Sequence, residues 1–222
     1  MLLMIKNVLT ENQLKVIAKL LENADFVDGK LSAGKEAVRV KNNVDLAQQS
    51  PLLDQLNQMV LPSLLQHKDY QASVFPLKVA TPFYARYKVG MQYGFHVDDP
   101  VMGPMQNRYR SDVSTTVFLN DDYDGGELVI KTAFGKQNIK PIAGDAVVYP
   151  SSSLHKVTKV TKGERLVAVT WAQSMIKDNA QRELLYELGQ ARETLLEKNP
   201  NSDETSKVSN VYANLVRSWS EV

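Results

Sequence analysis

The sequence predicts a mainly β protein, a sandwich or barrel with helices at both ends of the chain. Between residues 75 and 174, short runs of β-branched and aromatic residues are separated by turn residues, which is typical of antiparallel sheets and not of a parallel α/β sheet. Before and after this zone, apolar residues recur with the period of a helix. The 222 residues, of which 43% are apolar, are enough for one sizeable core.

Residues 1–70 are expected to be helical. Thr10 and Gln13 have the spacing of a capping box, which begins a helix. The apolar stripe that follows it has helical spacing and consists of Leu14, Ile17, Ala18 and Leu21. Pro51 is predicted to open a second helix at its first position, and Pro62 should end or kink that helix.

Six strands are predicted in the central zone. Gly125-Gly126 precedes one of them, and another begins after Gly144 and ends at Pro150. The strands are Phe83–Val89, Val113–Leu119, Glu127–Thr132, Ala146–Tyr149, His155–Val160 and Arg165–Trp171.

Residues 178–222 return to a helical pattern and carry a net charge of −3, against +4 for the rest of the chain. Residues 199–203 separate two apolar stripes. The first stripe is Leu184, Leu188, Ala191 and Leu195, and the second is Val208, Val211, Tyr212, Leu215 and Trp219. These stripes either pack against the β-core or form a homodimer interface, and the sequence is compatible with both.

Composition excludes several kinds of chemistry. The chain has no Cys, so a disulfide scaffold, a Cys-ligated zinc or iron–sulfur site and a cysteine nucleophile are impossible. A net charge of +1 is typical neither of a strongly basic nucleic-acid binder nor of a disordered acidic chain. Any histidine chemistry must use His67, His96 or His155.

The N-terminal apolar run stops at Lys6 and is shorter than the roughly 7–15 residues of a signal-peptide core. No later apolar run approaches the ~20 residues that span a bilayer. The sequence therefore predicts a cytoplasmic protein without a membrane segment.

Two histidines in the central zone suggest a metal site. His96 and Asp98 are two residues apart on an extended segment, so their side chains point to the same face. His155 lies 57 residues after Asp98, on a strand that can be the neighbour of the first in an antiparallel sheet. Two histidines and one carboxylate leave three open positions on an octahedral metal, the pattern of non-haem Fe(II) oxygenases. A His-x-Asp motif alone is weak evidence.

An arginine strengthens this interpretation. Arg165 begins the last predicted strand, and alternation places four residues on one face: Arg165, Val167, Val169 and Trp171. A guanidinium among apolar groups costs free energy unless it pairs with an anion, and its planar fork suits a carboxylate. A small dicarboxylate cosubstrate is therefore predicted, and an arginine that reaches solvent from the strand end is the alternative.

These residues belong to a longer ordered set. The set is Tyr87, Gly90, Tyr93, His96, Asp98, Leu119-Asn120, Gly125-Gly126-Glu127-Leu128, Gly144-Asp145, Tyr149-Pro150, His155, Arg165 and Trp171. It resembles the Fe(II)/2-oxoglutarate dioxygenases of the prolyl 4-hydroxylase type. With its helical ends, the whole chain is similar in organisation to the bacterial PKHD-type hydroxylases.

The resemblance implies a double-stranded β-helix (jelly-roll) core over residues 77–175. An N-terminal helical region, residues 1–76, would pack on this core, and residues 176–222 would form a C-terminal helical extension. The implied reaction is hydroxylation of an unidentified small-molecule, amino-acid or peptidyl substrate, which consumes O2 and 2-oxoglutarate and releases succinate and CO2. L-ascorbate is implied as the agent that keeps the iron reduced, and no nucleic-acid partner is implied.

The resemblance also assigns residues. It places Fe(II) at His96, Asp98 and His155, and the distal carboxylate of 2-oxoglutarate at Arg165. Tyr87 matches a tyrosine that contacts 2-oxoglutarate, and ordinary aromatic packing is its alternative role. No catalytic side chain is expected beyond the metal ligands.

Other interpretations stay open at this point. A non-enzymatic, cupin-like metal sensor or storage protein could use the same three ligands without Arg165, and a nucleic-acid demethylating dioxygenase would share the iron chemistry. A third alternative is a subunit-interaction protein that works through the 178–222 helices. Arg108 and Arg110, in the loop between residues 99 and 112, either contact an acidic substrate or are solvated or paired with Asp112. His67 is expected to be solvated or to cap the C-terminal end of a helix, and Tyr93 and Trp171 are expected to pack in the core.

Overall fold

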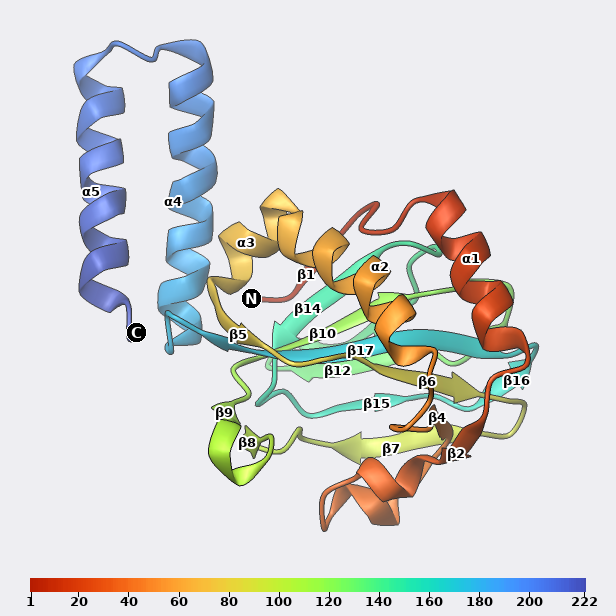
Figure 1. Ribbon diagram of the computed structural model, residues 1–222. Coiled ribbons are helices and arrows are strands. Elements are labelled where there is room, and N and C mark those ends of the chain that lie inside the picture. Colours follow the sequence, from red (N-terminus) through yellow and green to blue (C-terminus); the bar gives the residue numbers. More distant parts are fainter.

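Two antiparallel β-sheets form the centre of the protein, which we describe from a computed structural model of residues 1–222 (Figure 1). The larger sheet has the strand order β1 (Leu3–Ile5), β14 (Ala146–Pro150), β10 (Val113–Phe118), β17 (Arg165–Ser174), β6 (Phe83–Tyr87), β4 (Val44–Leu46) and β2 (Phe26–Asp28), with β5 (Pro76–Val79) beside β17. The smaller sheet has the order β13 (Gly135–Ile139), β12 (Leu128–Thr132), β15 (His155–Val157), β7 (Gln92–His96) and β3 (Lys41–Asn42). The predicted fold class, mainly β with flanking helices, is confirmed.

Two short pairings complete the strands. They join β8 (Val101–Met102) to β9 (Tyr109–Arg110), and β11 (Asp124–Gly125) to β16 (Val160–Lys162). Three 3-10 turns occupy Gly29–Ser32, Ala37–Arg39 and Met105–Asn107.

The inner faces of the two sheets share a buried apolar layer. The larger sheet contributes Ala85, Tyr87, Phe118, Val147, Tyr149 and Val167, and the smaller sheet and the segments beside it contribute Leu128, Ile130, Val157 and Val160. Alternation along β17 sends Arg165, Val167, Val169 and Trp171 toward this interior. The intervening residues of β17 face the helices instead, because successive strand residues point to opposite faces.

Three helices cover the outer face of the larger sheet: α1 (Glu11–Glu22), α2 (Leu53–Gln66) and α3 (Lys68–Val74) (Figure 1). Their buried residues join those of the sheet in one core cluster. The predicted capping box of Thr10 and Gln13 is present at the start of α1. Ile17 and Leu21 are buried as predicted, but Ala18 is exposed because it lies beside the contact face.

The expectation that residues 1–70 are helical is wrong for four short segments. β1 and β2 lie at the two edges of the larger sheet, β4 lies beside β2, and β3 is the edge of the smaller sheet. Strands of two or three residues leave no period in the sequence, because their hydrogen bonds go to distant segments. These strands make the first third of the chain part of both sheets.

The second helix also differs from its prediction. α2 begins at Leu53, two residues after Pro51, and continues past Pro62 to Gln66. A proline inside a helix removes one hydrogen bond and adds a steric clash. Leu56, Val60 and Leu64 are nevertheless fully buried on one side of α2, and their packing holds the helix to the sheet through the proline.

The predicted central strands are present, with bounds shifted by a few residues. β6 ends at Tyr87, and Val89 beyond it is 62% exposed. β13 was not predicted, because this edge strand is polar and exposed over most of its length. Its pairing with β12 depends on the turn at Gly135, which has a φ of 119°, a conformation that favours glycine.

The C-terminal helices α4 (Asn179–Lys198) and α5 (Asp203–Trp219) form an antiparallel hairpin that projects from the sheets (Figure 1). Its base packs through Leu185 and Trp219 on Phe75 and Ile176. The first predicted stripe is misplaced, since Leu184 is 58% exposed whereas Leu185 is buried. The second stripe is mostly half-buried against α4, although Val211 is 53% exposed. No helix combines the length and apolar character that a membrane span needs.

Candidate functional site

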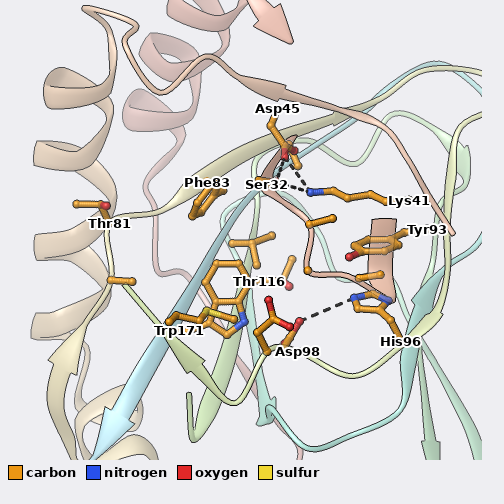
Figure 2. A pocket seen from close by; sticks show the side chains of 18 of the residues that line it. Ser32, Lys41, Asp45, Thr81, Phe83, Tyr93, His96, Asp98, Thr116 and Trp171 are labelled. Atoms are coloured by element: carbon orange, nitrogen blue, oxygen red, sulfur yellow. Dashed lines mark hydrogen bonds and ion pairs between the residues drawn. The ribbon is translucent and has the colours of Figure 1, made fainter. Parts of the chain in front are cut away.

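A cavity of about 850 Å³ opens between the two sheets (Figure 2), and the residues predicted to bind the metal and the cosubstrate all line it. Its walls come from the inner faces of both sheets, from the N-terminal segment 32–48 and from the loop 97–109. His96, Asp98, His155, Arg165 and Tyr87 all face it. One space can therefore hold a metal ion, a cosubstrate and a substrate group.

The three predicted metal ligands lie together. β15 pairs with β7, and His155 is opposite His96 in the register. Asp98 Oδ1 lies 3.8 Å from Nε2 of His96 and 3.8 Å from Nε2 of His155. The candidate ligand atoms all fall within 4.8 Å of one another, and the three side chains are only 5–9% exposed.

Hydrogen bonds orient each of these side chains. Nδ1 of His96 donates to the carbonyl of Gly94, and Nδ1 of His155 donates to the carbonyl of Ser153, each at 2.9 Å. A carbonyl only accepts, so both Nδ1 atoms carry the proton and both Nε2 lone pairs are free for a metal.

The carboxylate is held in a similar way. Ser114 on β10 donates to Asp98 Oδ2 at 2.5 Å, and Ser151 lies 2.8 Å from the same serine oxygen. Since a hydroxyl has one hydrogen, Ser151 is the donor to Ser114. Oδ2 is thereby occupied, and Oδ1 is left to face the two imidazoles.

Burial, followed by the neighbouring His155, lowers the pKa of His96 to about 4 from its ordinary 6.5. The imidazole is therefore neutral at pH 7, which is the form that binds a metal ion. Below pH 6.5 the unfolded chain takes up a proton at this residue that the folded protein does not. The free energy of unfolding contributed by His96 is thus present above pH 6.5 and lost as the pH falls toward 4.

We expect denaturant unfolding of the metal-free protein to show this loss of stability between pH 6.5 and about 4. His96→Gln removes the titrating group and should make the decline in this window shallower than in the wild type. Equal declines in the two proteins would contradict the assignment of the effect to His96.

Arg165 is a buried cation without an anion. It is 1% exposed, its Nε has no hydrogen-bond partner, and none of the ion pairs in the protein involves it. Its Cζ lies 5.1 Å from the ring centre of Tyr87 and 5.3 Å from that of Phe118. Gly126 packs on it so closely that an added Cβ would lie 3.1 Å from Arg165 Cδ. The site fits a carboxylate, because a buried guanidinium is stable when an anion is bound.

Tyr87 lies directly across the strand pair from Arg165. Its side chain belongs to the apolar layer between the sheets and also lines the cavity. Burial raises the pKa of Tyr87 well above its ordinary value. The phenol is therefore protonated at neutral pH and available as a hydrogen-bond donor.

The structure adds residues that the sequence did not predict for the site. Lys41 and Asp45 form a buried ion pair at the cavity wall, with Ser32 beside them. Tyr93, which was expected only to pack, stacks on His96 with 3.7 Å between ring centres. No local pattern could have found Lys41, because its aromatic neighbour Tyr93 is 52 residues further along the chain.

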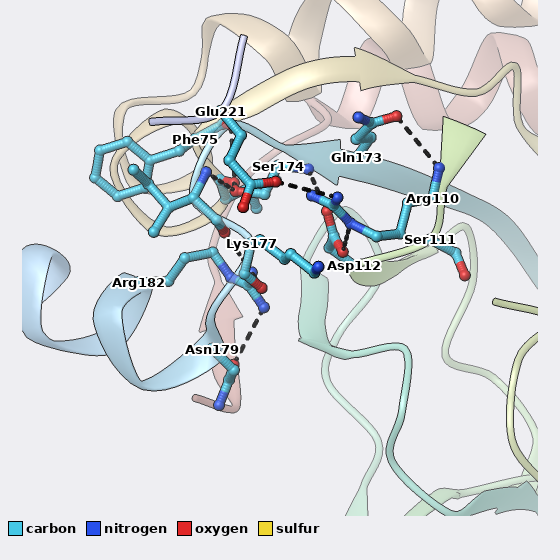
Figure 3. Close-up of polar contacts among 12 residues, drawn as sticks. Phe75, Arg110, Ser111, Asp112, Gln173, Ser174, Lys177, Asn179, Arg182 and Glu221 are labelled. Atoms are coloured by element: carbon cyan, nitrogen blue, oxygen red, sulfur yellow. Dashed lines mark hydrogen bonds and ion pairs between the residues drawn. The ribbon is translucent and has the colours of Figure 1, made fainter. Parts of the chain in front are cut away.

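The remaining candidates do not line the cavity. Arg110 pairs with Asp112 at 2.6 Å and with Glu221 at 3.4 Å, so it ties the base of the loop to the C-terminal tail (Figure 3). Arg108 is exposed and does not line the cavity. His67 joins α2 to α3, where its Nδ1 accepts from the Asp69 amide at 3.2 Å.

Comparisons with known proteins agree with this geometry. Residues 82–173 match the 2OG-Fe(II) oxygenase superfamily, and residues 179–221 match the PKHD-type hydroxylase C-terminal domain. A PKHD-type hydroxylase of Thioalkalivibrio sulfidiphilus is 52% identical over the full length of both chains. The PKHD-type hydroxylase YbiX of Escherichia fergusonii is 41% identical over 98% of each chain.

Solved structures share the fold. A prolyl-4-hydroxylase from Pseudomonas putida superposes with a TM-score of 0.52 at 19% identity, over 78% of this chain and 92% of that one. HygX from Streptomyces hygroscopicus, solved with nickel, 2-oxoglutarate and hygromycin B, superposes with a TM-score of 0.57 at 14% identity, over 79% and 84% of the chains. The predicted jelly-roll core is confirmed by these likenesses.

Proposed function

The chain belongs to the PKHD-type hydroxylases of the 2OG-Fe(II) oxygenase superfamily, and on that premise we propose that His96, Asp98 and His155 bind its iron. It is an Fe(II)- and 2-oxoglutarate-dependent dioxygenase that hydroxylates an unidentified substrate and releases succinate and CO2. The observation that carries the assignment is the convergence of two Nε2 atoms and one carboxylate oxygen within 4.8 Å in the same cavity as an unpaired arginine.

The donor set suits ferrous iron. Two neutral imidazoles and one carboxylate bind one side of an octahedral ion and leave three positions for other ligands. A sensor or storage site would need only these ligands, whereas the buried, anion-free guanidinium of Arg165 in the same cavity requires a negatively charged partner. The presence of Arg165 in the same cavity as the three proposed ligands therefore favours the dioxygenase over the metal-storage alternative.

Arg165 binds the distal carboxylate of 2-oxoglutarate in this proposal, and Tyr87 donates a hydrogen bond to the same cosubstrate. The apolar side chains around Arg165 exclude water and so strengthen the ion pair. Iron and 2-oxoglutarate, when bound, supply the oxidation of a C–H bond by O2. The chain itself supplies the ligands, the orientation of the cosubstrate and a dry pocket.

The proposal predicts that the iron-loaded protein converts 2-oxoglutarate to succinate under air, even before its substrate is known. Succinate should form only when Fe(II), 2-oxoglutarate and O2 are all present, and it can be measured by chromatography coupled to mass spectrometry. Replacement of 2-oxoglutarate by glutarate, which lacks the keto group, is the matched control. Succinate formation no faster than in protein-free Fe(II) solution would contradict the proposal.

Three features complete the proposed function. The substrate is a small molecule or an amino-acid or peptidyl group, as the cavity volume of about 850 Å³ allows. L-ascorbate keeps the iron reduced between turnovers. A homodimer forms through the C-terminal hairpin, where Leu184 and Val211 are exposed on α4 and α5.

A further inference from the structure

The N-terminal segment 40–46 contacts β7 at the residues that orient His96. Val40 accepts a hydrogen bond from the Gly94 amide at 2.9 Å, and the Gly94 carbonyl accepts the one from His96 Nδ1, also at 2.9 Å. The two segments are so close that a Cβ at Gly94 would lie 2.8 Å from Val40 Cβ. The backbone that fixes the tautomer of His96 is therefore itself held by the N-terminal segment.

Three side chains continue this contact into the cavity. Lys41 on β3 is opposite Tyr93 in the register of the smaller sheet, and its Nζ lies 5.5 Å from the centre of the Tyr93 ring. The Tyr93 ring stacks on the imidazole of His96, with 3.7 Å between centres and 12° between planes. Lys41, Tyr93 and His96 thus form a column that ends at a proposed iron ligand (Figure 2).

The lysine at the far end of the column is fixed by its own hydrogen bonds. Its Nζ donates to Asp45 Oδ2 at 2.9 Å and to Ser32 Oγ at 2.7 Å. Ser32 and Asn43 donate to the two oxygens of the same carboxylate at 2.6 and 2.7 Å. Lys41 is 9% exposed and Asp45 is 4% exposed, so the ammonium group has little freedom to move.

Stability alone does not account for this pair. Burying two charges costs desolvation free energy, and apolar residues of similar volume commonly give equal or greater stability. The pair does, however, hold the cation over the Tyr93 ring, which a hydrocarbon side chain could not do in the same way. Its location therefore points to a role in the metal centre.

We propose that Lys41, held by Asp45 and Ser32, is a positioning residue that keeps Tyr93 flat against the iron ligand His96. The proposal rests on the assignment of His96 to the iron. It gives the N-terminal segment a part in the metal centre, although no residue of that segment is a proposed ligand.

Co(II) binding, followed by its visible absorption bands, tests this proposal without turnover. Tyr93→Leu removes the stacked ring and should weaken Co(II) binding roughly 10-fold, as is typical for groups that orient a metal ligand. Tyr93→Phe keeps the ring and should bind within about two-fold of the wild type. Lys41→Met should also weaken binding and change the absorption bands, and Lys41→Arg should restore much of both because arginine stacks on aromatic rings as well.

Controls separate positioning from loss of fold. Arg192→Met removes a comparable cation, 5.3 Å from the Tyr212 ring in the C-terminal hairpin, and should leave Co(II) affinity unchanged. Lys41→Met leaves Asp45 buried without its partner, so the double variant K41Q/D45N, which removes both charges together, is measured beside it. It should fold and still show the weakened binding.

Each outcome has one meaning. Equal losses in Tyr93→Phe and Tyr93→Leu would overturn the proposal, because the hydroxyl and not the stacked ring would then matter. Unchanged Co(II) affinity and bands in both Lys41→Met and K41Q/D45N would overturn it as well. Failure of the proposed function is distinguishable, since His96→Ala would then bind Co(II) as tightly as the wild type.

Discussion

His96→Ala is expected to abolish succinate formation by the iron-loaded protein. The substitution removes one of three proposed iron ligands at a position where Asp98 and His155 cannot replace it. Metal affinity and activity should each fall by more than 10- to 100-fold, or about 1.4–2.8 kcal/mol, which is the loss typical of altering a residue that only orients a ligand. Isothermal calorimetry with Co(II) and a succinate assay under air measure the two consequences separately.

The third histidine provides a matched control for this prediction. His67 caps α3, with its Nδ1 3.2 Å from the Asp69 amide, and it does not line the cavity. His67→Ala should therefore lower stability by about 1 kcal/mol, as is typical for loss of a helix cap, and keep full succinate formation. Equal activity in His96→Ala and the wild type would reject the iron assignment, and equal inactivation by His67→Ala would show that the effect is not specific to the site.

Replacing Arg165 is expected to have the second largest effect, and on a different quantity. Arg165→Met should raise the 2-oxoglutarate concentration needed for half-maximal turnover by roughly 30-fold or more. Truncating one partner of a buried, hydrogen-bonded charge pair typically costs about 2–5 kcal/mol, and each 1.4 kcal/mol is a factor of ten. Affinity for Co(II) in the absence of 2-oxoglutarate should change little, since Arg165 is not one of the proposed metal ligands.

Two variants sharpen the Arg165 prediction. Arg165→Lys keeps the charge but loses the planar fork, so its requirement for 2-oxoglutarate should lie between those of the wild type and Arg165→Met. Arg86→Met removes another buried arginine, which donates to the Leu21 carbonyl at 2.5 Å on the opposite face of the larger sheet. An unchanged 2-oxoglutarate requirement in Arg165→Met, or an equal rise in Arg86→Met, would contradict the role of Arg165.

The central strands could be predicted from the sequence because their signal is local. Alternation along residues 165–171 correctly assigned Arg165 and Trp171 to one face, and both line the cavity. His96 and Asp98 could be placed on the same side by their spacing alone. The prediction that His155 lies near His96 and Asp98 required an assumption about strand order, which the pairing of β15 with β7 confirms.

The N-terminal third was harder to predict for a physical reason. β1 to β4 contain two or three residues each, and their partners lie about 40 to 145 residues away, apart from the local pair β2 and β4. Such strands form because a sheet edge is available, and not because of their own propensity. For the same reason, the sequence did not predict that Lys41 and Asp45 line the cavity.

The contact between Ser114 and Asp98 has a consequence for the whole sandwich. Ser114 belongs to the larger sheet, whereas His96 and His155 belong to the smaller one, so an ion bound by the triad would fasten the two sheets together. A ligand that binds only the folded state stabilises it by mass action, by about 4 kcal/mol at a thousand times its dissociation constant. A chelator in the purification buffer would then lower the resistance to heat and proteolysis as well as the activity. The chain has no disulfide that could hold the two sheets together in place of the ion.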